Sequence, residues 1–232
     1  MHDDRKTHLL TTLQSEIDKG RLPGAVVMLS RHGKIELFES LGLQDPEVKT
    51  PMTKESIFRI YSMTKPIVSV AVMMLMEQGK LLLSDPVSKY LPEYAKQQVA
   101  VEAGGQVSYV PAKLATVQDL LRHTAGLTYE FLGNSAAQKA YRTTKIGMTL
   151  RDVNNAEFSK ILAAQPLQYD PATMWEYSRA TDVVGVLIEA ISGQTLGNYL
   201  EEHIFKPLKM LETGFNVPVD KYHRIAEPFK KD

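Results

Sequence analysis

"RIYSMTKPIVSVAVMMLMEQGKL", residues 59–81, carries a serine and a lysine three positions apart near its start, Ser62 and Lys65, and continues as an apolar run. The run predicts a helix, and residues three apart lie on the same face of a helix about one turn from each other. Pro66 suits the first turn, where the backbone N–H groups have no partner inside the helix. Because the following residues are apolar on all sides, we expect this helix to run through a core.

The pair Ser62 and Lys65 has a chemical and a structural interpretation. A lysine at the edge of a core is partly desolvated, and the positive potential of a helix N-terminus adds to that effect. We therefore expect the pKa of Lys65 to fall toward that of a general base. A hydroxyl beside such an amine is an activated nucleophile. In the structural interpretation Ser62 caps the helix and Lys65 points to solvent, and the bare S-x-x-K tetrapeptide does not decide between the two.

The composition excludes several classes of site. Lys plus Arg and Asp plus Glu both number 27 in 232 residues, so the basic excess of a nucleic-acid or anionic-membrane binder is missing. Without cysteine there is no disulfide, thiolate metal site or Cys nucleophile. The six histidines lack metal spacing, so we expect neither a metal nor a cofactor. The charged N-terminus and the short apolar runs predict a cytoplasmic protein with no membrane partner.

The order of predicted elements is a short β part followed by a helical part. A first helix is expected to stop near Gly20, and two β-rich runs flanking residues 31–34 predict a hairpin. Residues 96–113 are expected to form a loop, as is "LGLQDPEVKTPMT" after the hairpin. The remaining predicted helices are "SDPVSKYLPEY", "TVQDLLRHTAG" with a Thr116/Asp119 capping box, "NAEFSKILAAQ" capped by Asn155, "SRATDVVGVLIEAISG" and "TLGNYLEEHIFKPL".

Tyr177 stands directly before a strongly apolar helix that Ser178 is expected to cap. A phenol at such a junction can point into a cleft and carry a proton, which chemistry on an acyl group requires. By itself, a tyrosine of this kind is more often a packed aromatic residue with its hydroxyl at the surface. His123, in "LLRHTAG", is expected to be structural.

Together these segments resemble the serine β-lactamase and penicillin-binding-protein superfamily, in its class C β-lactamase and family VIII carboxylesterase branch. The resemblance implies an α+β, β-lactamase/transpeptidase-like fold with an antiparallel sheet, flanking helices and a helical region. It implies an N-terminal part of the α/β domain at residues 1–80, a helical domain at 81–215 and the start of a return to the α/β domain at 216–232. The blocks that carry it are "FRIYSMTKP", "LSDPVSKYLPEY", "TVQDLLRHTAGL", "YDPATMWEYS", "DVVGVLIEAISGQTLGNYLEEHIFKPLKM" and "ET".

The resemblance also implies roles for individual residues. Ser62 is the acylated nucleophile, Lys65 its base partner, and Tyr177 the second base and the proton donor to the leaving group. Contacts with substrate are expected from five further residues: Tyr61, Tyr129, Phe131, Trp175 and Arg179.

Two departures from the family pattern bear on function. Class C β-lactamases have Y-x-N where this chain has Tyr177-Ser178-Arg179, a change that favours esters over lactams. The chain ends at "RIAEPFKKD", before the remaining strands and the third motif, K-T-G or a variant, of family members. We therefore expect an incomplete sheet that a further C-terminal segment or a second chain completes.

These features predict a serine hydrolase that acts through an acyl-enzyme on small-molecule carboxylic esters. Alternatives on the same fold are a β-lactamase or D-alanyl-D-alanine carboxypeptidase with an amide substrate, or an acyltransferase to an alcohol. A catalytically silent binding or scaffold relative is the alternative outside enzymology.

Overall fold

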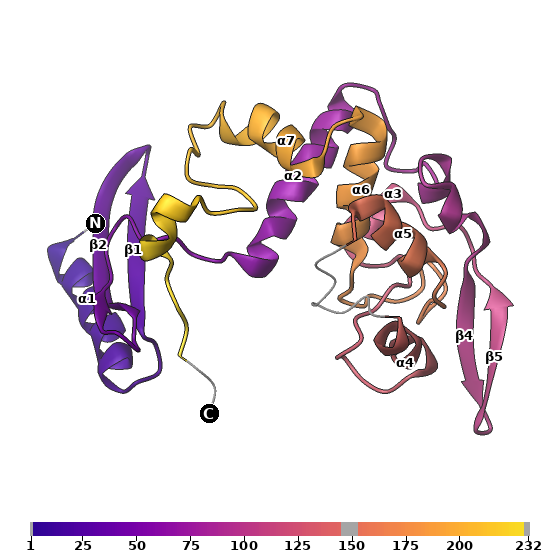
Figure 1. Cartoon of the computed structure of the whole chain (residues 1–232), viewed down its shortest axis with the longest axis horizontal. Helices are drawn as coiled ribbons and strands as arrows, with labels where there is room; N and C mark the ends of the chain where they lie inside the picture. Colours follow the sequence, from indigo (N-terminus) through magenta and orange to yellow (C-terminus); the bar gives the residue numbers. More distant parts are fainter. Residues whose placement is uncertain (1, 145–152, 230–232) are drawn as a thin grey trace. The chain divides into compact units, whose positions relative to one another are not determined.

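The computed structural model describes residues 2–144 and 153–229, and its contacts divide the chain into two units (Figure 1). One unit comprises Met1–Tyr61 with Gly214–Asp232, and the other comprises Ser62–Thr213. The boundary differs from the expected one at residue 80, because helix α2 (Thr64–Glu77) packs against α6 (Ala180–Ser192) of the helical unit. Helices combined with small antiparallel sheets confirm the expected α+β class.

The N-terminal unit contains helix α1 (Asp3–Asp18) and an antiparallel sheet of strand order β1-β2-β3. The hairpin of β1 (Gly24–Arg31) and β2 (Lys34–Asp45) is confirmed, with Gly33 at φ +75° in its turn. Gly24 sits so close to β2 that a Cβ there would lie 2.5 Å from the carbonyl oxygen of Leu43. The loop expected after the hairpin is wrong in part, since β2 continues to Asp45 and pairs with β3 (Thr50–Pro51).

The last described residues join this same unit. They follow a 3-10 helix, η5 (Val219–Arg224), and Ile225 bridges Ile57 in parallel. The Ile57 N–H donates to the Arg224 carbonyl at 2.8 Å, and the Ala226 N–H donates to the Ile57 carbonyl at 2.8 Å. Chain segments far apart in the sequence are therefore tied together by backbone hydrogen bonds.

The core of the helical unit lies between α2 and α6. The residues that α2 contributes to this core are Val68, Ala71, Val72 and Leu75. Helix α6 is buried along most of its length. The expectation that α2 runs through a core is confirmed on one face, whereas Val70 is exposed and Met73, Met74 and Met76 are half-buried. One face of α2 makes the core, and its N-terminal end carries Ser62 and Lys65.

Shorter elements complete the helical unit: η2 (Val87–Lys89), η3 (Pro92–Lys96), β4 (Gln98–Ala103), β5 (Gln106–Pro111), α3 (Val117–Arg122), α4 (Ala136–Thr143), α5 (Asn155–Ala163), α7 (Leu196–Leu200) and the π-helical turn η4 (Glu201–Phe205). The loop expected at 96–113 is instead the β4–β5 hairpin, and "SDPVSKYLPEY" forms two 3-10 helices in place of one α-helix.

The helix caps are confirmed in one case and corrected in two. The Thr116/Asp119 capping box at α3 is present. Helix α5 is capped by Asn154 and not by Asn155, because the Asn154 side chain accepts from the Glu157 N–H at 2.9 Å. The cap position of α6 is Arg179, although the Ser178 hydroxyl accepts from the Ala180 N–H at 3.3 Å.

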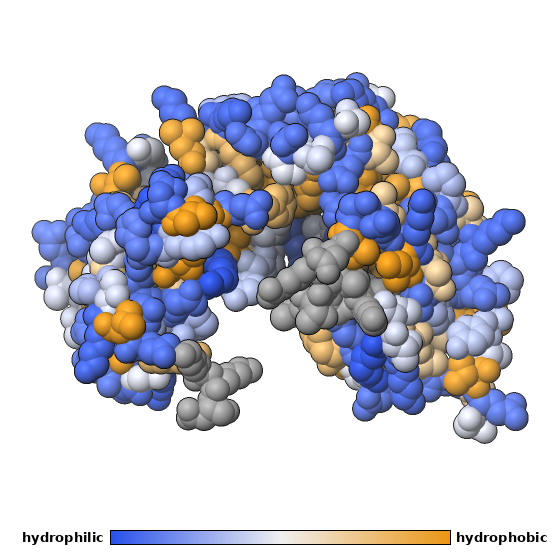
Figure 2. Space-filling view, in the orientation of Figure 1, coloured by the Kyte–Doolittle hydropathy of each residue, from blue (hydrophilic) through white to orange (hydrophobic). Residues whose placement is uncertain are grey.

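The described surface is mainly hydrophilic on the face seen in Figure 2, where apolar residues form separate patches. Of the helices in the described part of the chain, none combines the length and the apolar character that crossing a bilayer requires.

Candidate functional site

Ser62, Lys65 and Tyr177 meet in the helical unit, although 115 positions separate Ser62 from Tyr177 in the chain. The Lys65 Nζ donates to the Ser62 Oγ at 3.1 Å. The Tyr177 hydroxyl donates to the same oxygen at 2.8 Å. The Ser62 oxygen is therefore held by two side chains that can each exchange a proton with it.

Local backbone geometry places the serine ahead of its helix. Ser62 lies in a 3-10 turn, η1 (Tyr61–Met63), and α2 follows from Thr64 with Met63 at the cap position and no side-chain cap. Ser62 is exposed and makes no cap, so the structural interpretation of this serine receives no support. The preceding residue, Tyr61, has a φ of +43°, which is uncommon for a residue with a side chain and is often found at functional sites.

The hydrogen bond between Lys65 and Tyr177 shifts the pKa values of both side chains. Burial lowers the pKa of Lys65, but the hydrogen bond to Tyr177 and the nearby Tyr129 outweigh burial and leave this pKa raised. The hydrogen bonds from Lys65 and Ser62 lower the pKa of the Tyr177 hydroxyl. The expected fall in the lysine pKa is therefore wrong, because two phenol oxygens face the ammonium and favour its charged form. Of the two groups, Tyr177 is therefore the one that loses its proton more readily.

Tyr129 is the second phenol beside Lys65, and a tight turn brings it there. Gly126 has a φ of +79°, and a Cβ at this position would lie 2.0 Å from the Tyr169 carbonyl oxygen. The Tyr129 ring lies 5.5 Å from the Tyr177 ring and 4.9 Å from the Phe131 ring, centroid to centroid. Burial raises the pKa of Tyr129, which keeps its hydroxyl protonated.

Arg179 holds this loop and does not face open space. Its side chain is 7% exposed, and its Nη2 donates to Glu130 Oε1 at 2.6 Å and to Oε2 at 2.8 Å. The guanidinium carbon lies 5.1 Å from the centre of the Tyr129 ring. Guanidinium donors of Arg179 are therefore turned to the partly buried Glu130 carboxylate, and contact between Arg179 and substrate stays a prediction.

The other residues expected to contact substrate differ in their surroundings. Phe131 and Trp175 are 63% and 65% exposed, and Trp175 contacts His123 edge-on at 6.3 Å between ring centroids. Tyr61 is 74% exposed and belongs to the N-terminal unit. Phe131 and Trp175 therefore offer exposed aromatic surface on the segments that carry Tyr129 and Tyr177, and Tyr61 directly precedes Ser62 in the chain.

Three residues around the site were not expected to have a role in it. Glu130 pairs with Arg179, Glu176 accepts from the Thr128 hydroxyl at 2.7 Å, and His123 packs on the Tyr177 ring at 5.0 Å. The sequence carries one usable signal, since Glu130 directly follows Tyr129 and its partner Arg179 takes the place of the family's asparagine. For the other two, only the fold brings the partners together.

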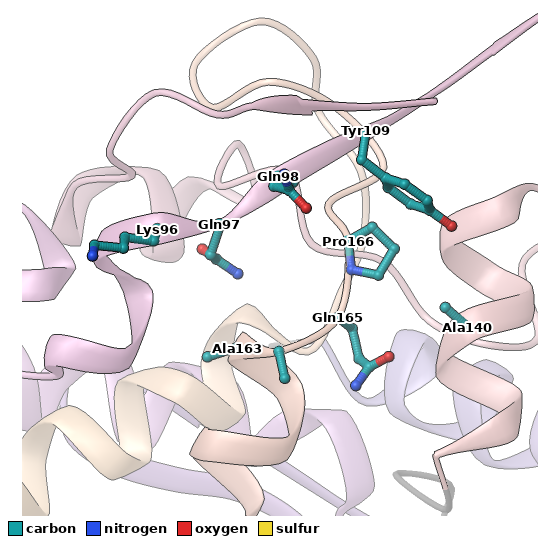
Figure 3. A pocket seen from close by; sticks show the side chains of 9 residues that line it. Lys96, Gln97, Gln98, Tyr109, Ala140, Ala163, Gln165 and Pro166 are labelled. Atoms are coloured by element: carbon teal, nitrogen blue, oxygen red, sulfur yellow. The ribbon is translucent and has the colours of Figure 1, made fainter. Parts of the chain in front are cut away.

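A separate cavity of about 360 Å³ lies between the β4–β5 hairpin, α4 and the end of α5 (Figure 3). Its lining comprises Lys96, Gln97, Gln98, Tyr109, Ala140, Ala163, Ala164, Gln165 and Pro166. Amides and alanines dominate, and this lining includes no serine or histidine, so the cavity does not offer the chemistry of the Ser62 site. In residues 2–144 and 153–229, no three His, Asp or Glu side chains converge as a metal site would require.

The arrangement around Ser62 is suited to nucleophilic chemistry on an acyl group. Once Tyr177 has lost its proton, the Ser62 hydroxyl has a proton acceptor at 2.8 Å and can attack a carbonyl carbon, and the phenol then returns the proton to a leaving group. The ammonium of Lys65 stabilises negative charge on the phenol oxygen and on the serine oxygen.

Curated proteins share a large part of this sequence. Esterase EstB of Burkholderia gladioli is 36% identical over 84% of this chain and 47% of its own length. Protein Rv1367c of Mycobacterium tuberculosis (strain ATCC 25618 / H37Rv) is 34% identical over 95% of this chain and 54% of its own length. The chain thus spans about half the length of the curated relatives it matches.

Solved structures have the same fold. EstCE1, described as a hydrolase with promiscuous acyltransferase activity, superposes with a TM-score of 0.82 at 31% identity, over 97% of this chain and 59% of its own. A class C beta-lactamase superposes with a TM-score of 0.73 at 20% identity, over 100% of this chain and 58% of its own, a likeness of fold alone. The Beta-lactamase family model matches residues 9–231. Because the family model matches most of this chain and two relatives are more than 30% identical to it, this chain belongs to the beta-lactamase family.

Proposed function

We propose that the protein hydrolyses carboxylic esters of small to medium acids through an acyl-enzyme on Ser62. The observation that carries the proposal is the double hydrogen bond at the Ser62 oxygen, from Lys65 at 3.1 Å and from Tyr177 at 2.8 Å. A nucleophile and its base within hydrogen-bond reach, with a third group that tunes the base, is the pattern of activated nucleophiles.

In the proposed reaction Tyr177 moves the proton. The phenolate form of Tyr177, favoured by Lys65, takes the proton of the Ser62 hydroxyl as the Ser62 oxygen bonds to the ester carbonyl carbon. The bond from that carbon to the alkoxy oxygen then breaks, and the leaving alkoxide takes the proton from Tyr177. In the second half water attacks the acyl carbon and gives a proton to the same phenolate. The bond from that carbon to the Ser62 oxygen then breaks, and Tyr177 returns the proton to this oxygen, which releases the acid and restores both side chains.

Esters are favoured over lactams because position 179 has no free amide to offer. Class C β-lactamases have an asparagine at the position that matches Arg179, whereas here the Arg179 side chain is paired with Glu130. The similarity to Esterase EstB supports the same choice. A second candidate is acyl transfer to an alcohol in place of water, supported by the likeness to EstCE1 and by the exposure of Ser62.

Ser62→Ala should abolish hydrolysis of p-nitrophenyl esters by the full-length protein while leaving its thermal unfolding unchanged, because the Ser62 hydroxyl makes no helix cap. Ser69→Ala, on the same helix, is the matched control and should keep its activity. Substantial turnover by purified Ser62→Ala protein would remove Ser62 from the mechanism. Nitrocefin and an added alcohol acceptor, tested on the unmodified protein, separate lactam hydrolysis and acyl transfer from ester hydrolysis.

Tyr177→Phe should lower the acylation rate by roughly 10²- to 10⁴-fold, the usual contribution of a general acid–base group. Rapid mixing with a fluorophosphonate probe measures this step directly. Tyr199→Phe is the control, because the Tyr199 hydroxyl is buried and has no hydrogen-bond partner in the described residues. A Tyr177→Phe protein that reacts as fast as the Tyr199→Phe protein would show that the phenol is structural.

Arg179→Met should destabilise the fold by about 3–5 kcal/mol, the typical effect of removing one partner from a buried ion pair. Urea unfolding measures this change, and the double variant Glu130→Gln/Arg179→Met should recover part of it. The solvent-exposed pair of Lys206 and Glu201 supplies the control, since Lys206→Met should cost under about 1 kcal/mol. Unchanged stability with a raised KM for esters would instead make Arg179 a substrate-binding residue.

A further inference from the structure

His123 holds the segment that carries Tyr177 from both sides. It ends α3 with a φ of +56°, and its carbonyl oxygen accepts from the Glu176 N–H at 3.0 Å. Its Nδ1 lies 3.3 Å from the Ser178 backbone nitrogen and 3.1 Å from the Ser178 hydroxyl. The residues immediately before and after Tyr177 are therefore both fixed to one histidine, whose ring also packs on the Tyr177 ring at 5.0 Å.

These contacts fix the protonation state of the ring. The Ser178 N–H can only donate, so Nδ1 must accept, and the proton of the neutral imidazole resides on Nε2. The Ser178 hydroxyl accepts from the Ala180 N–H at 3.3 Å, which leaves its own proton free to point at Nδ1. A second proton on the ring would place an N–H against the Ser178 N–H and break this anchor.

Burial and the charge of Lys65 also favour the neutral ring. Lys65 faces it from α2, and Tyr177 faces it from the segment before α6. On its own helix, the Asp119 carboxylate accepts from Thr116 and Thr124, while Glu176 accepts from Thr128. Burial, and then the charge of Lys65, lower the pKa of His123 below its ordinary value near 6.5.

We propose that neutral His123 is a positioning residue for Tyr177, and that protonating His123 releases the Ser178 anchor and stops acylation of Ser62. The proposal rests on the proposed function and deepens it, because it adds a second ionisation to the acid limb of the pH profile of acylation. His123 itself touches no reacting atom.

The direction of the pH effect follows from the two pKa shifts. Tyr177 must lose a proton to act as a base, so acylation falls as the pH drops below the pKa of Tyr177, itself lowered from its ordinary value near 10. His123 must stay neutral, so a further fall begins once the pH drops below the His123 pKa, which lies under 6.5. The acid limb of kcat/KM should therefore steepen from about tenfold per pH unit to about a hundredfold.

The test compares pH profiles of kcat/KM for a p-nitrophenyl ester in the full-length protein and in His123→Asn. Asparagine tolerates the left-handed backbone, and its side-chain oxygen can accept from Ser178 without titrating. The variant should keep most of the activity at neutral pH and lose the steep part of the acid limb. His203→Asn is the matched control, because His203 packs on Tyr199 at 4.4 Å with the same 44° tilt. An acid limb that is equally steep in His123→Asn and in the unmodified protein would overturn the proposal.

A readout independent of turnover keeps the two proposals separable. Nitrogen-15 NMR of the histidine rings, assigned with the same variant, should show His123 as the Nε2–H tautomer with a pKa below 6.5. The Tyr177 ring signals should shift as His123 titrates. An Nδ1–H tautomer, or Tyr177 signals that do not respond, would contradict the positioning role. Absence of any Ser62 acylation alongside the expected NMR result would instead remove the proposed function.

Discussion

The site depends on one contact, the Ser62 oxygen held at once by the Lys65 ammonium and the Tyr177 phenol. This contact requires the start of α2 and the Tyr177 segment to be held in place, and the Tyr129 loop lies beside Lys65; each of these segments is fixed by a different interaction. The start of α2 is set by the packing of α2 on α6. The Tyr177 segment is set by His123 and by Thr128 with Glu176, and the Tyr129 loop is set by Gly126 and the pair of Arg179 with Glu130.

The electrostatics of the site follow from the same arrangement. A lysine at the edge of a core loses solvation, but here two phenol oxygens replace the lost water and keep the ammonium charged. The hydrogen bond from the Lys65 ammonium lowers the pKa of Tyr177, so this phenol loses its proton more readily and is available as a base. Arg179 adds no charge to this exchange, because Glu130 neutralises it in a buried pair.

Much of the site could be predicted from the sequence, and the rest depends on contacts between distant residues. The helical spacing of Ser62 and Lys65, the hairpin at residues 24–45 and the Thr116/Asp119 cap all arise from neighbours along the chain. By contrast, the raised pKa of Lys65 requires Tyr129 and Tyr177, which local sequence does not place beside it. His123 acts through contacts with Ser178, which lies 55 positions further along the chain. Arg179 acts through contacts with Glu130, which lies 49 positions before it. The β4–β5 hairpin was missed because its strands are largely exposed and lack a buried apolar face.

The central claim is that an ester acylates Ser62 and no other residue. The full-length protein, mixed with a slowly hydrolysed p-nitrophenyl ester and quenched in acid within the first turnover, can be digested and analysed by mass spectrometry. The account predicts that the acyl mass appears on the peptide containing Ser62, in an amount that matches the burst of released nitrophenol. An acyl group on another residue, or ester turnover with no acylated peptide at any quench time, would contradict it.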